Sequence, residues 1–481
     1  MTDVPALWTS EEAARATGGR AEGAWRAEGV SIDSRTLVPG DLFVALRGPT
    51  FDGHAFVAAA LARGAAAAVV ARRPDGVEGA ALLLVDDTLK ALQDLGRAAR
   101  ARARAGIVGV TGSVGKTGVK EALLLVLGRQ GATHASVGSF NNHWGVPLSL
   151  ARTPPTARFA VFEMGMNHAG EIAPLTRQVR PHVAVITTVE AVHIENFLSV
   201  EAIADAKAEI FSGLEQGGTA VLERDNRHFE RLRRLAREAG VGRILSFGRS
   251  AEADVRLHAA REDSDGTTVE ADVRGVQLIY RVGIAGRHWA TNSLGVLAAV
   301  HALGADVAAA AAALADLRPS KGRGLRTSVS LLHGRFELID DSYNASPASM
   351  AASFEVLRRS RPADGGRRIA VLGDMLELGA DAPALHAGLA RALVENRIDL
   401  VFTAGPLMAH LRAALPAGMR AAHCADSATL APEVAAAVRP GDVISVKGSA
   451  ASRMRAVVEA LLALQPGAAR EAGSPAAPRG D

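Results

Sequence analysis

The sequence predicts an α/β protein of three domains, in which a mostly parallel central sheet with flanking helices carries a phosphate-binding loop. Three observations predict this fold. The length of 481 residues suits several domains, because single domains usually span ~100–200 residues. Short apolar runs alternate with helical stretches along most of the chain, which is typical of parallel sheets. A glycine-rich turn joins one such run to a helix near residue 112.

The composition is that of a globular protein from a reducing compartment. Hydrophobic residues make up 48% and charged residues 22%, close to the average of globular domains. No stretch reaches the ~20 apolar residues of a membrane span, and the first residues lack the layout of a signal peptide. Cys424 is the single cysteine, which excludes an internal disulfide. We therefore expect a cytoplasmic protein without a membrane span.

The charge balance argues against a nucleic-acid partner. Lysine and arginine total 54 against 51 acidic residues, and aromatic residues make up only 4%. The basic run at residues 97–104 is interpreted as a solvated helix end before a domain boundary. Small-molecule partners are expected instead.

The first two blocks of the chain each predict strands and helices in alternation. In residues 1–104, GDLFVALRG, AFVAAALARGAAAAVVA and ALLLVDD predict a strand, a helix and a strand. In residues 105–324, IVGVT runs into a helix, and ARFAVFEM, HVAVITTV and GTAVLE predict further buried strands. Alternating polar and apolar residues over 251–282 predict a small antiparallel patch.

The third block, residues 325–465, predicts a second open sheet. RFELIDD, RRIAVLGDM, LVFTAG and DVISVKGS predict strands separated by helices. Asp341, Asp374 and Lys447 stand near the ends of these strands, where open α/β sheets bind ligands. Residues 466–481 are rich in Pro, Gly and Ala without periodicity, and we expect a disordered tail.

The strongest chemical signal is the turn Thr111-Gly112-Ser113-Val114-Gly115-Lys116-Thr117. Such a loop between a strand and a helix presents main-chain N–H groups to a polyphosphate. A lysine at the position of Lys116 contacts the outer phosphates, and a hydroxyl at the position of Thr117 can bind Mg²⁺. Val110 stands where the longer form of the motif has glycine, so the match is the shorter GxxGKT form. A plain glycine turn with a surface lysine would show the same residues.

Three further residues are candidates on local grounds. Glu163 ends an apolar strand beside the loop and can hold Mg²⁺, although a solvated carboxylate at a strand end has the same pattern. His193 also follows a strand, and a lone histidine is more often a packed or surface residue. Lys207 lies on a predicted helix, where a solvated lysine is the usual case.

Taken together, the motifs resemble those of the Mur ligases, ATP-dependent amide-forming enzymes of peptidoglycan precursor synthesis. TGSVGKT, SFNNHWGVPLSL, FEMGMNHAGEI, VHIENF and AKAEIFSGL resemble the central domain of that family. SIDSRTLVPGDLFVALRGPTFDGHAF resembles its UDP-sugar-binding N-terminal domain, and GRGLR, DDSYNASPASM, VLGDMLELG and SVKGS its C-terminal domain. The resemblance covers the chain apart from the tail.

The resemblance implies roles for individual residues. It implies catalytic roles for Lys116, His193, Lys207 and Arg323, and ATP binding by Thr111 to Thr117, Asn142, Asn292, Arg323 and Asp341, with Asn141 beside the metal. It implies that two Mg²⁺ ions are held by Thr117, Glu163, His193 and Lys207, the last as a carbamate. It implies UDP-substrate binding by Ser34, Arg35, Asp52, Gly53 and His54, and dipeptide binding by Asn344, Lys447 and Ser449. Trp289 stands where the family often has an asparagine.

The reaction that the resemblance implies joins D-alanyl-D-alanine to UDP-N-acetylmuramoyl-tripeptide at the expense of ATP, in a monomeric enzyme. The C-terminal motifs favour this member over the one that adds the third residue, which would show aspartate-tyrosine-alanine-histidine and DNPR stretches absent here. A folylpolyglutamate-type ligase and a non-catalytic nucleotide-binding protein are rival interpretations. Closure of the third domain is expected to use a hinge at residues 321–324.

Overall fold

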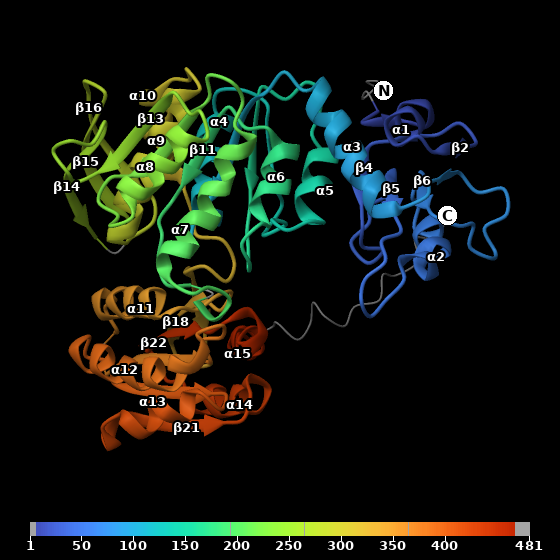
Figure 1. The fold of residues 1–481 in the computed structure, drawn as a ribbon. Helices are drawn as coiled ribbons and strands as arrows, with labels where there is room; N and C mark the ends of the chain where they lie inside the picture. Colours follow the sequence, from blue (N-terminus) through green and yellow to red (C-terminus); the bar gives the residue numbers. More distant parts are fainter. Residues whose placement is uncertain (1–5, 193, 264, 364, 467–481) are drawn as a thin grey trace, which may run out of the picture.

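The structure is a computed structural model that describes residues 6–192, 194–263, 265–363 and 365–466. Three bodies follow one another along the chain, each built on its own sheet (Figure 1). The α/β fold class predicted from the sequence is confirmed. None of the helices in the described ranges combines the length and the apolar character that crossing a bilayer requires. The predicted disordered tail lies outside the described residues, apart from Pro466.

The N-terminal body holds a five-stranded sheet of order β2-β7-β6-β5-β4, parallel except for β2, and a small β1-β3 pair. Its strands are β1 (Trp8–Thr9), β2 (Arg20–Glu22), β3 (Arg26–Ala27), β4 (Gly29–Ser31), β5 (Asp41–Val44), β6 (Ala67–Val70) and β7 (Leu82–Leu84). Its helices are α1 (Ser10–Thr17), α2 (Val57–Ala62) and α3 (Thr88–Arg102), with a 3₁₀ turn, η1, at Gly53–Phe56.

The central body is a nine-stranded sheet of order β16-β15-β14-β13-β12-β11-β8-β10-β9. Its strands are β8 (Gly106–Thr111), β9 (Thr133–Ala135), β10 (Phe159–Glu163), β11 (Val183–Ile186), β12 (Thr219–Glu223), β13 (Arg243–Gly248), β14 (Val255–Glu262), β15 (Thr267–Val273) and β16 (Val276–Val282). All the pairs from β9 to β14 are parallel, and β14 to β16 run antiparallel.

Helices cover both faces of the central sheet, which is why its parallel strands are buried throughout. One face packs against α4 (Lys116–Gly128), α9 (Arg287–Ala302) and α10 (Val307–Ala313). The other packs against α5 (Gly145–Ala151), α6 (Ile172–Val179), α7 (Val200–Ala208) and α8 (Phe229–Glu238). Loops at the carboxyl ends of β8, β10, β11 and β12 are left to form a site.

The C-terminal body is a six-stranded sheet of order β17-β18-β22-β19-β20-β21, in which only the β17–β18 pair is antiparallel. Its strands are β17 (Leu325–Ser330), β18 (Arg335–Asp341), β19 (Arg368–Gly373), β20 (Leu400–Ala404), β21 (Arg420–Cys424) and β22 (Val443–Lys447). Its helices are α11 (Pro347–Arg359), α12 (Ala382–Glu395), α13 (Met408–Ala414), α14 (Ser427–Ala437) and α15 (Arg455–Leu462).

The N-terminal and central bodies share a core and buried polar contacts. Leu148 and Ala151 of α5 belong to the apolar cluster of the N-terminal sheet. The Trp8 indole N–H donates to the Ala151 carbonyl at 2.9 Å, and Arg152 Nε donates to the Val30 carbonyl. Arg100 of α3 donates to the last carbonyls of α6. These contacts join the two bodies firmly.

One expectation about the elements needs correction, and another is extended by the structure. The predicted helix at residues 55–71 ends at Ala62, because Gly64 adopts a φ of +92° and Ala67–Val70 pairs between β5 and β7 as β6. Pairing inside the sheet outweighs the helix propensity of the alanine run. The antiparallel patch at 251–282 is correct as a local pattern, but β14 pairs with β13, so the patch extends the main sheet.

Candidate active site

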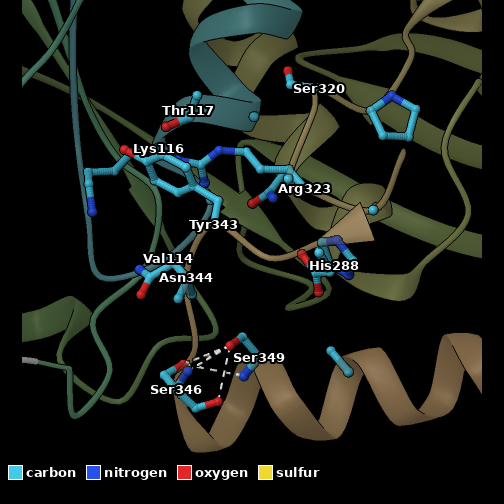
Figure 2. Close-up of a pocket in the computed structure, with 18 of the residues that line it drawn as sticks. Val114, Lys116, Thr117, His288, Ser320, Arg323, Tyr343, Asn344, Ser346 and Ser349 are labelled. Atoms are coloured by element: carbon cyan, nitrogen blue, oxygen red, sulfur yellow. Dashed lines mark hydrogen bonds between the residues drawn. The ribbon is translucent and has the colours of Figure 1, made fainter. Parts of the chain in front are cut away.

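The phosphate-binding loop joins β8 to α4 and leaves the first N–H groups of the helix open (Figure 2). Gly115 at the N-cap has a φ of 86° and supplies no side-chain cap. Gly112 has a φ of 147°, and a Cβ there would collide with the Thr187 side chain. Uncapped N–H groups at a helix start form an anion site. Both glycines are therefore required by the backbone.

The end of β11 holds this loop in place. Ser113 N–H donates to the Thr188 carbonyl at 2.9 Å, and the Thr187 hydroxyl donates to the Val114 carbonyl at 2.6 Å. The Ser113 hydroxyl donates to the Glu190 carbonyl and accepts from the Glu190 N–H, both at 2.9 Å. The loop is thus formed before any ligand arrives, which lowers the entropic cost of binding.

The Lys116 ammonium folds back over the loop. Its Nζ donates to the Gly112 carbonyl at 2.7 Å and to the Ser113 carbonyl at 3.3 Å. Burial lowers the pKa of Lys116, the Glu163 charge raises it, and the Arg323 charge lowers it. Lys116 is therefore held where a polyphosphate lying on the loop would meet a positive charge.

A buried carboxylate lies directly beside the first turn of α4. Glu163 at the end of β10 is 1% exposed. Its Oε2 accepts from the Thr117 hydroxyl and its Oε1 from the Asn141 amide, both at 2.7 Å. Within the described ranges no lysine or arginine forms an ion pair with it. A buried carboxylate beside a hydroxyl is a donor set that fits a hard divalent cation.

Lys207 of α7 is an unusual buried lysine. It is 3% exposed, and burial together with the Lys116 charge lowers its pKa well below its ordinary value. No carboxylate among the described residues pairs with it. A neutral amine is the reactive form toward carbon dioxide, so its burial fits conversion to a carbamate, which is an anion. His193, the other expected metal ligand, lies outside the described residues.

The described residues fit Mg²⁺ but contain no complete protein cage for it. No group of three or more His, Cys, Asp or Glu side chains comes together in the described ranges. Mg²⁺ typically uses one or two carboxylates together with substrate phosphates and water, so such a cage is not needed. Thr117 and Glu163 would supply the protein ligands next to the phosphate loop.

The segment that connects the central and C-terminal bodies, residues 321–324, contributes an arginine to the same space. The Arg323 Nη2 donates to the Ser139 hydroxyl at 3.2 Å, across the gap between the two bodies. Its guanidinium lies 4.2 Å from the centroid of the Tyr343 ring, a cation–π contact (Figure 2). The Tyr343 ring therefore holds Arg323 in a position that faces the phosphate loop.

A partly buried ion pair marks the carboxyl edge of the C-terminal sheet. Lys447 and Asp341 are register partners at the ends of β22 and β18, and their Nζ and Oδ2 lie 2.7 Å apart. Lys447 also donates to the Asn344 carbonyl at 2.9 Å. Burial raises the pKa of Asp341, while Lys447 and then Arg323 lower it. Desolvation in the cleft and the Lys447 charge lower the pKa of His288 to about 4.

Two side chains of α9, Asn292 and Trp289, lie next to the phosphate loop and the start of α4. A Cβ on Gly115 would come within 3.1 Å of the Asn292 amide nitrogen, so Asn292 borders the loop. The Trp289 ring lies over Gly118 in the first turn of α4, where a Cβ would meet its Cη2 at 2.8 Å. The Trp289 indole and the Asn292 amide therefore lie where the phosphate loop leads into the first turn of α4.

These groups line one cleft of about 1210 Å³ between the central and C-terminal bodies. Of the residues singled out from the sequence, it gathers the following: Ser113, Val114, Gly115, Lys116, Thr117, Asn141, Glu163, Trp289, Asn292, Arg323, Asp341, Asn344, Lys447 and Ser449. Thr111, Gly112, Asn142 and Lys207 do not line it. The Asn142 side-chain oxygen instead accepts from the N–H groups of Trp144 and Gly145 at the start of α5. Asp374 accepts from the Met408 N–H at 2.8 Å, a structural contact.

The residues expected at the UDP substrate lie apart, in the N-terminal body. Arg35 is exposed and pairs with Asp33 at 2.7 Å, next to Ser34. Asp52 accepts from the His54 N–H and ring, and these hydrogen bonds lower its pKa to about 2. The other ring nitrogen of His54 accepts from the Ala71 N–H, and Gly53 lies against the Leu46 carbonyl.

Several groups in the cleft escaped the sequence reasoning. Tyr343 under Arg323, Ser139 beside it and the capping pair Ser346–Ser349 of α11 all line the space (Figure 2). Ser-Pro before an apolar helical run is a recognisable cap signal that could have placed Ser346. The Arg323–Ser139 contact joins residues 184 positions apart, so no local signal could reveal it.

A phosphate loop on a parallel sheet, faced across a cleft by a separate domain, is the arrangement expected of an ATP-dependent ligase. Comparison with known families agrees with this. The family model "Mur ligase middle domain" matches residues 110–300, "Mur ligase, glutamate ligase domain" residues 325–450, and "Mur ligase family, catalytic domain" residues 26–100. The chain belongs to the Mur ligase family.

Relatives of this chain carry one common name. The UDP-N-acetylmuramoyl-tripeptide–D-alanyl-D-alanine ligase of Escherichia coli is 36% identical over 90% of this chain and 93% of its own length. The enzyme of the same name from Bacillus subtilis is 34% identical, again over 90% and 93%. Both relatives therefore match along all three bodies.

Solved structures give the same picture. A crystal structure of MurF from Acinetobacter baumannii has a TM-score of 0.82 and 29% identity, covering 96% of this chain and 100% of the other. A MurF ligase from Thermotoga maritima in complex with ADP has a TM-score of 0.73 and 28% identity, with 91% and 97% covered. The three-body architecture is therefore shared with these proteins.

Proposed function

We propose that this protein joins D-alanyl-D-alanine to UDP-N-acetylmuramoyl-tripeptide at the expense of ATP, releasing ADP and phosphate, in the cytoplasm where ATP is available. The observation that carries the proposal is the cleft itself. Lys116 on the phosphate loop, the Glu163–Thr117 pair and Arg323 from the segment that connects the central and C-terminal bodies border one space. The names of the relatives, which match over nine-tenths of the chain, supply the substrates.

The chemistry that needs this arrangement is activation of a carboxylate. A carboxylate is a poor acyl donor, because its leaving group would be an oxide. Transfer of the γ-phosphoryl group from ATP to a carboxylate oxygen gives an acyl phosphate and ADP. The dipeptide amine then attacks the carbonyl carbon, phosphate leaves with its bonding pair, and the amine loses a proton to give the amide.

The residues of the chain stabilise the charge that gathers in this reaction. We assign Lys116 and Arg323 to the transferring phosphoryl group, because both cations face the phosphate loop. Thr117, Glu163 and a carbamylated Lys207 would hold Mg²⁺, which when bound neutralises charge on the phosphate oxygens. Asn141 orients Glu163 by donating to its Oε1. His193 keeps its predicted role as a further ligand.

The nucleotide and the two other substrates would occupy different bodies. Main-chain groups of Thr111 and Gly112 complete the loop, while Asn292 and Asp341 border the space for the nucleoside. Ser34 and Arg35, with the Asp52–Gly53–His54 turn, remain our candidates for the UDP end. Asn344, Lys447 and Ser449 remain candidates for the dipeptide, although the Ser449 hydroxyl already accepts from the Leu376 N–H.

The proposal is tested by phosphate release from ATP with UDP-N-acetylmuramoyl-tripeptide, measured with and without D-alanyl-D-alanine. Release that depends on the dipeptide, together with a UDP-pentapeptide detected by mass spectrometry, is expected. Turnover with a single amino acid and a shorter UDP-peptide would instead assign the third-residue reaction. Slow ATP hydrolysis that the dipeptide leaves unchanged would indicate a nucleotide-binding protein without ligase chemistry.

A further inference from the structure

Lys120, one turn after the phosphate loop, is buried in a way that the proposed reaction leaves unexplained. Its side chain is 0% exposed, although a lysine is rarely fully buried without paired partners. It points from α4 toward the segment that follows β9. Lys120 does not line the cleft between the central and C-terminal bodies.

All three protons of the Lys120 ammonium have acceptors. Its Nζ donates to the Ser136 carbonyl at 2.7 Å and to the Gly138 carbonyl at 2.9 Å. The third partner is the Glu121 carboxylate, also at 2.7 Å. Gly138 has a φ of 55°, so the chain turns away from β10 here and its carbonyls lose their strand partners. The lysine replaces the N–H donors that a neighbouring strand would have supplied.

The segment that Lys120 holds carries two contacts of the candidate active site. Asn141 donates to Glu163 at 2.7 Å, and the Ser139 hydroxyl accepts from Arg323 at 3.2 Å. Ser136 itself also faces β10, where its hydroxyl accepts from the Glu163 N–H at 3.4 Å. One buried cation therefore links the helix that begins at the phosphate loop to the segment that meets Glu163 and Arg323.

We infer that Lys120 is a positioning residue, whose buried ammonium sets the distance between α4 and residues 136–142 and so aligns Asn141 and Ser139 with the phosphate loop. The inference rests on the proposed function for its kinetic consequences only. Lys120 donates to main-chain carbonyls, which no substitution can remove. The link between α4 and residues 136–142 is therefore tested by substituting the lysine.

The test compares Lys120→Met with Val126→Ala, a control on the same helix. Val126 is also fully buried and belongs to the apolar core between α4 and the central sheet, so its truncation is expected to destabilise α4 without removing a hydrogen bond to residues 136–142. Hydrogen–deuterium exchange of the free enzyme is the primary measurement. The Asn141 N–H donates to the Ser139 carbonyl within the segment, and the Gly165 N–H donates to the Asn141 carbonyl. Lys120→Met is expected to speed hydrogen exchange at both N–H groups. Val126→Ala is expected to leave both unchanged.

Kinetics and metal binding supply the second measurement. Lys120→Met is expected to lower kcat by about 30–100-fold, as a small misplacement of active-site groups does. The KM for the UDP substrate should stay within about 2-fold, since its site lies in the N-terminal body. Weaker Mn²⁺ binding with ADP, followed by electron spin resonance, is expected in the same variant. Lys120→Arg keeps a cation with several donors and should recover most of the loss.

Two results would overturn the inference: unchanged exchange at Asn141 and Gly165 in Lys120→Met, or a fall in kcat no larger than that of Val126→Ala at equal thermal stability. If Lys120→Met does not fold, Lys120→Gln, which retains one donor arm, takes its place in both measurements. Failure of the proposed function has a different signature, because the wild-type protein would then lack dipeptide-dependent phosphate release while the exchange comparison remains informative.

Discussion

Glu163 shows at the scale of one residue how burial prepares a carboxylate for a cation. Both of its oxygens accept hydrogen bonds, from Thr117 and Asn141, but no described cation pairs with it. Its hydrogen bonds thus come from neutral donors, while the Lys116 ammonium acts on it through charge alone. This leaves Glu163 with negative charge to offer a ligand.

Glu163→Gln is expected to lower phosphate release by about 100-fold or more, a loss typical of removing one preorganised electrostatic partner. The amide nitrogen of glutamine would also face a donor, either the Thr117 hydroxyl or the Asn141 amide. Steady-state rates and thermal unfolding are the measurements. An active variant of normal stability would remove Glu163 from the metal site.

The lowered pKa of Lys207 predicts that the free energy of unfolding depends on pH when carbon dioxide is excluded. Its folded pKa lies well below the ordinary 10.5, because burial and Lys116 disfavour the charge. Between these two values the unfolded chain holds the proton and the folded protein does not, so stability rises with pH. Relative to Lys207→Met, wild-type stability should therefore rise by about 1.4 kcal/mol per pH unit toward 10.5.

Denaturant unfolding of both proteins across this pH range checks the slope, and parallel curves would contradict it. Added bicarbonate extends the test. If Lys207 becomes a carbamate, bicarbonate should raise the thermal stability of the wild-type protein and leave Lys207→Met unaffected. Mass spectrometry under native conditions would detect the added carbon dioxide.

At the scale of elements, α3 connects the N-terminal body to the central one. Arg100 is 7% exposed and donates to the Val179 and Arg180 carbonyls, at 2.8 and 2.7 Å. These carbonyls end α6, where a cation is favoured by the helix dipole. Glu215 completes the contact at 3.0 Å.

Arg100→Met is expected to lower the free energy of unfolding by about 2–3 kcal/mol, because it leaves the Val179 and Arg180 carbonyls without their donor, whereas Glu215 keeps its ion pair with Arg180. Arg97→Met on the same helix is the matched control. Arg97 pairs only with Asp94 on the exposed side, so its loss should stay within about 0.5 kcal/mol. Urea titration distinguishes the two, and equal losses would disprove a special role for Arg100.

At the scale of the whole molecule, polar contacts between residues that the structure describes link the C-terminal body and its connecting segment to the central body. Arg323 reaches Ser139, and Arg359 of α11 pairs with Glu262 of β14. Arg287 adds to the charge around Glu262 at 3.6 Å. The connecting residues 321–324 include Gly322 and Gly324 with φ of 76° and 89°, and they remain our predicted hinge.

Arg359→Met is expected to loosen the contact between the C-terminal and central bodies without changing a residue that lines the cleft. The free enzyme should then show a larger radius of gyration by X-ray scattering, whereas the enzyme with ATP analogue and UDP substrate should not. The half-saturating ATP concentration should rise about 5-fold, equivalent to ~1 kcal/mol of closure free energy. Scattering profiles that ligands leave identical in the wild-type protein would argue against domain closure altogether.

Local sequence alone determined the parts of this protein that depend on neighbours along the chain. The glycine-lysine-threonine loop, Glu163 at a strand end and most parallel strands were predictable, because backbone freedom, helix starts and apolar runs are local properties. The strand at Ala67–Val70 was not, because only its place between β5 and β7 distinguishes it from a helix.

Only the tertiary structure decided which distant groups meet. The Arg323–Ser139 contact, the Lys447–Asp341 pair and the Lys120 ammonium under Ser136 and Gly138 join separate elements. The burial of Lys207 also depends on the helices packed around it, since its local pattern is that of a solvated lysine. Desolvation and hydrogen-bond partners depend on the whole fold, and these set the charge and reach of a side chain.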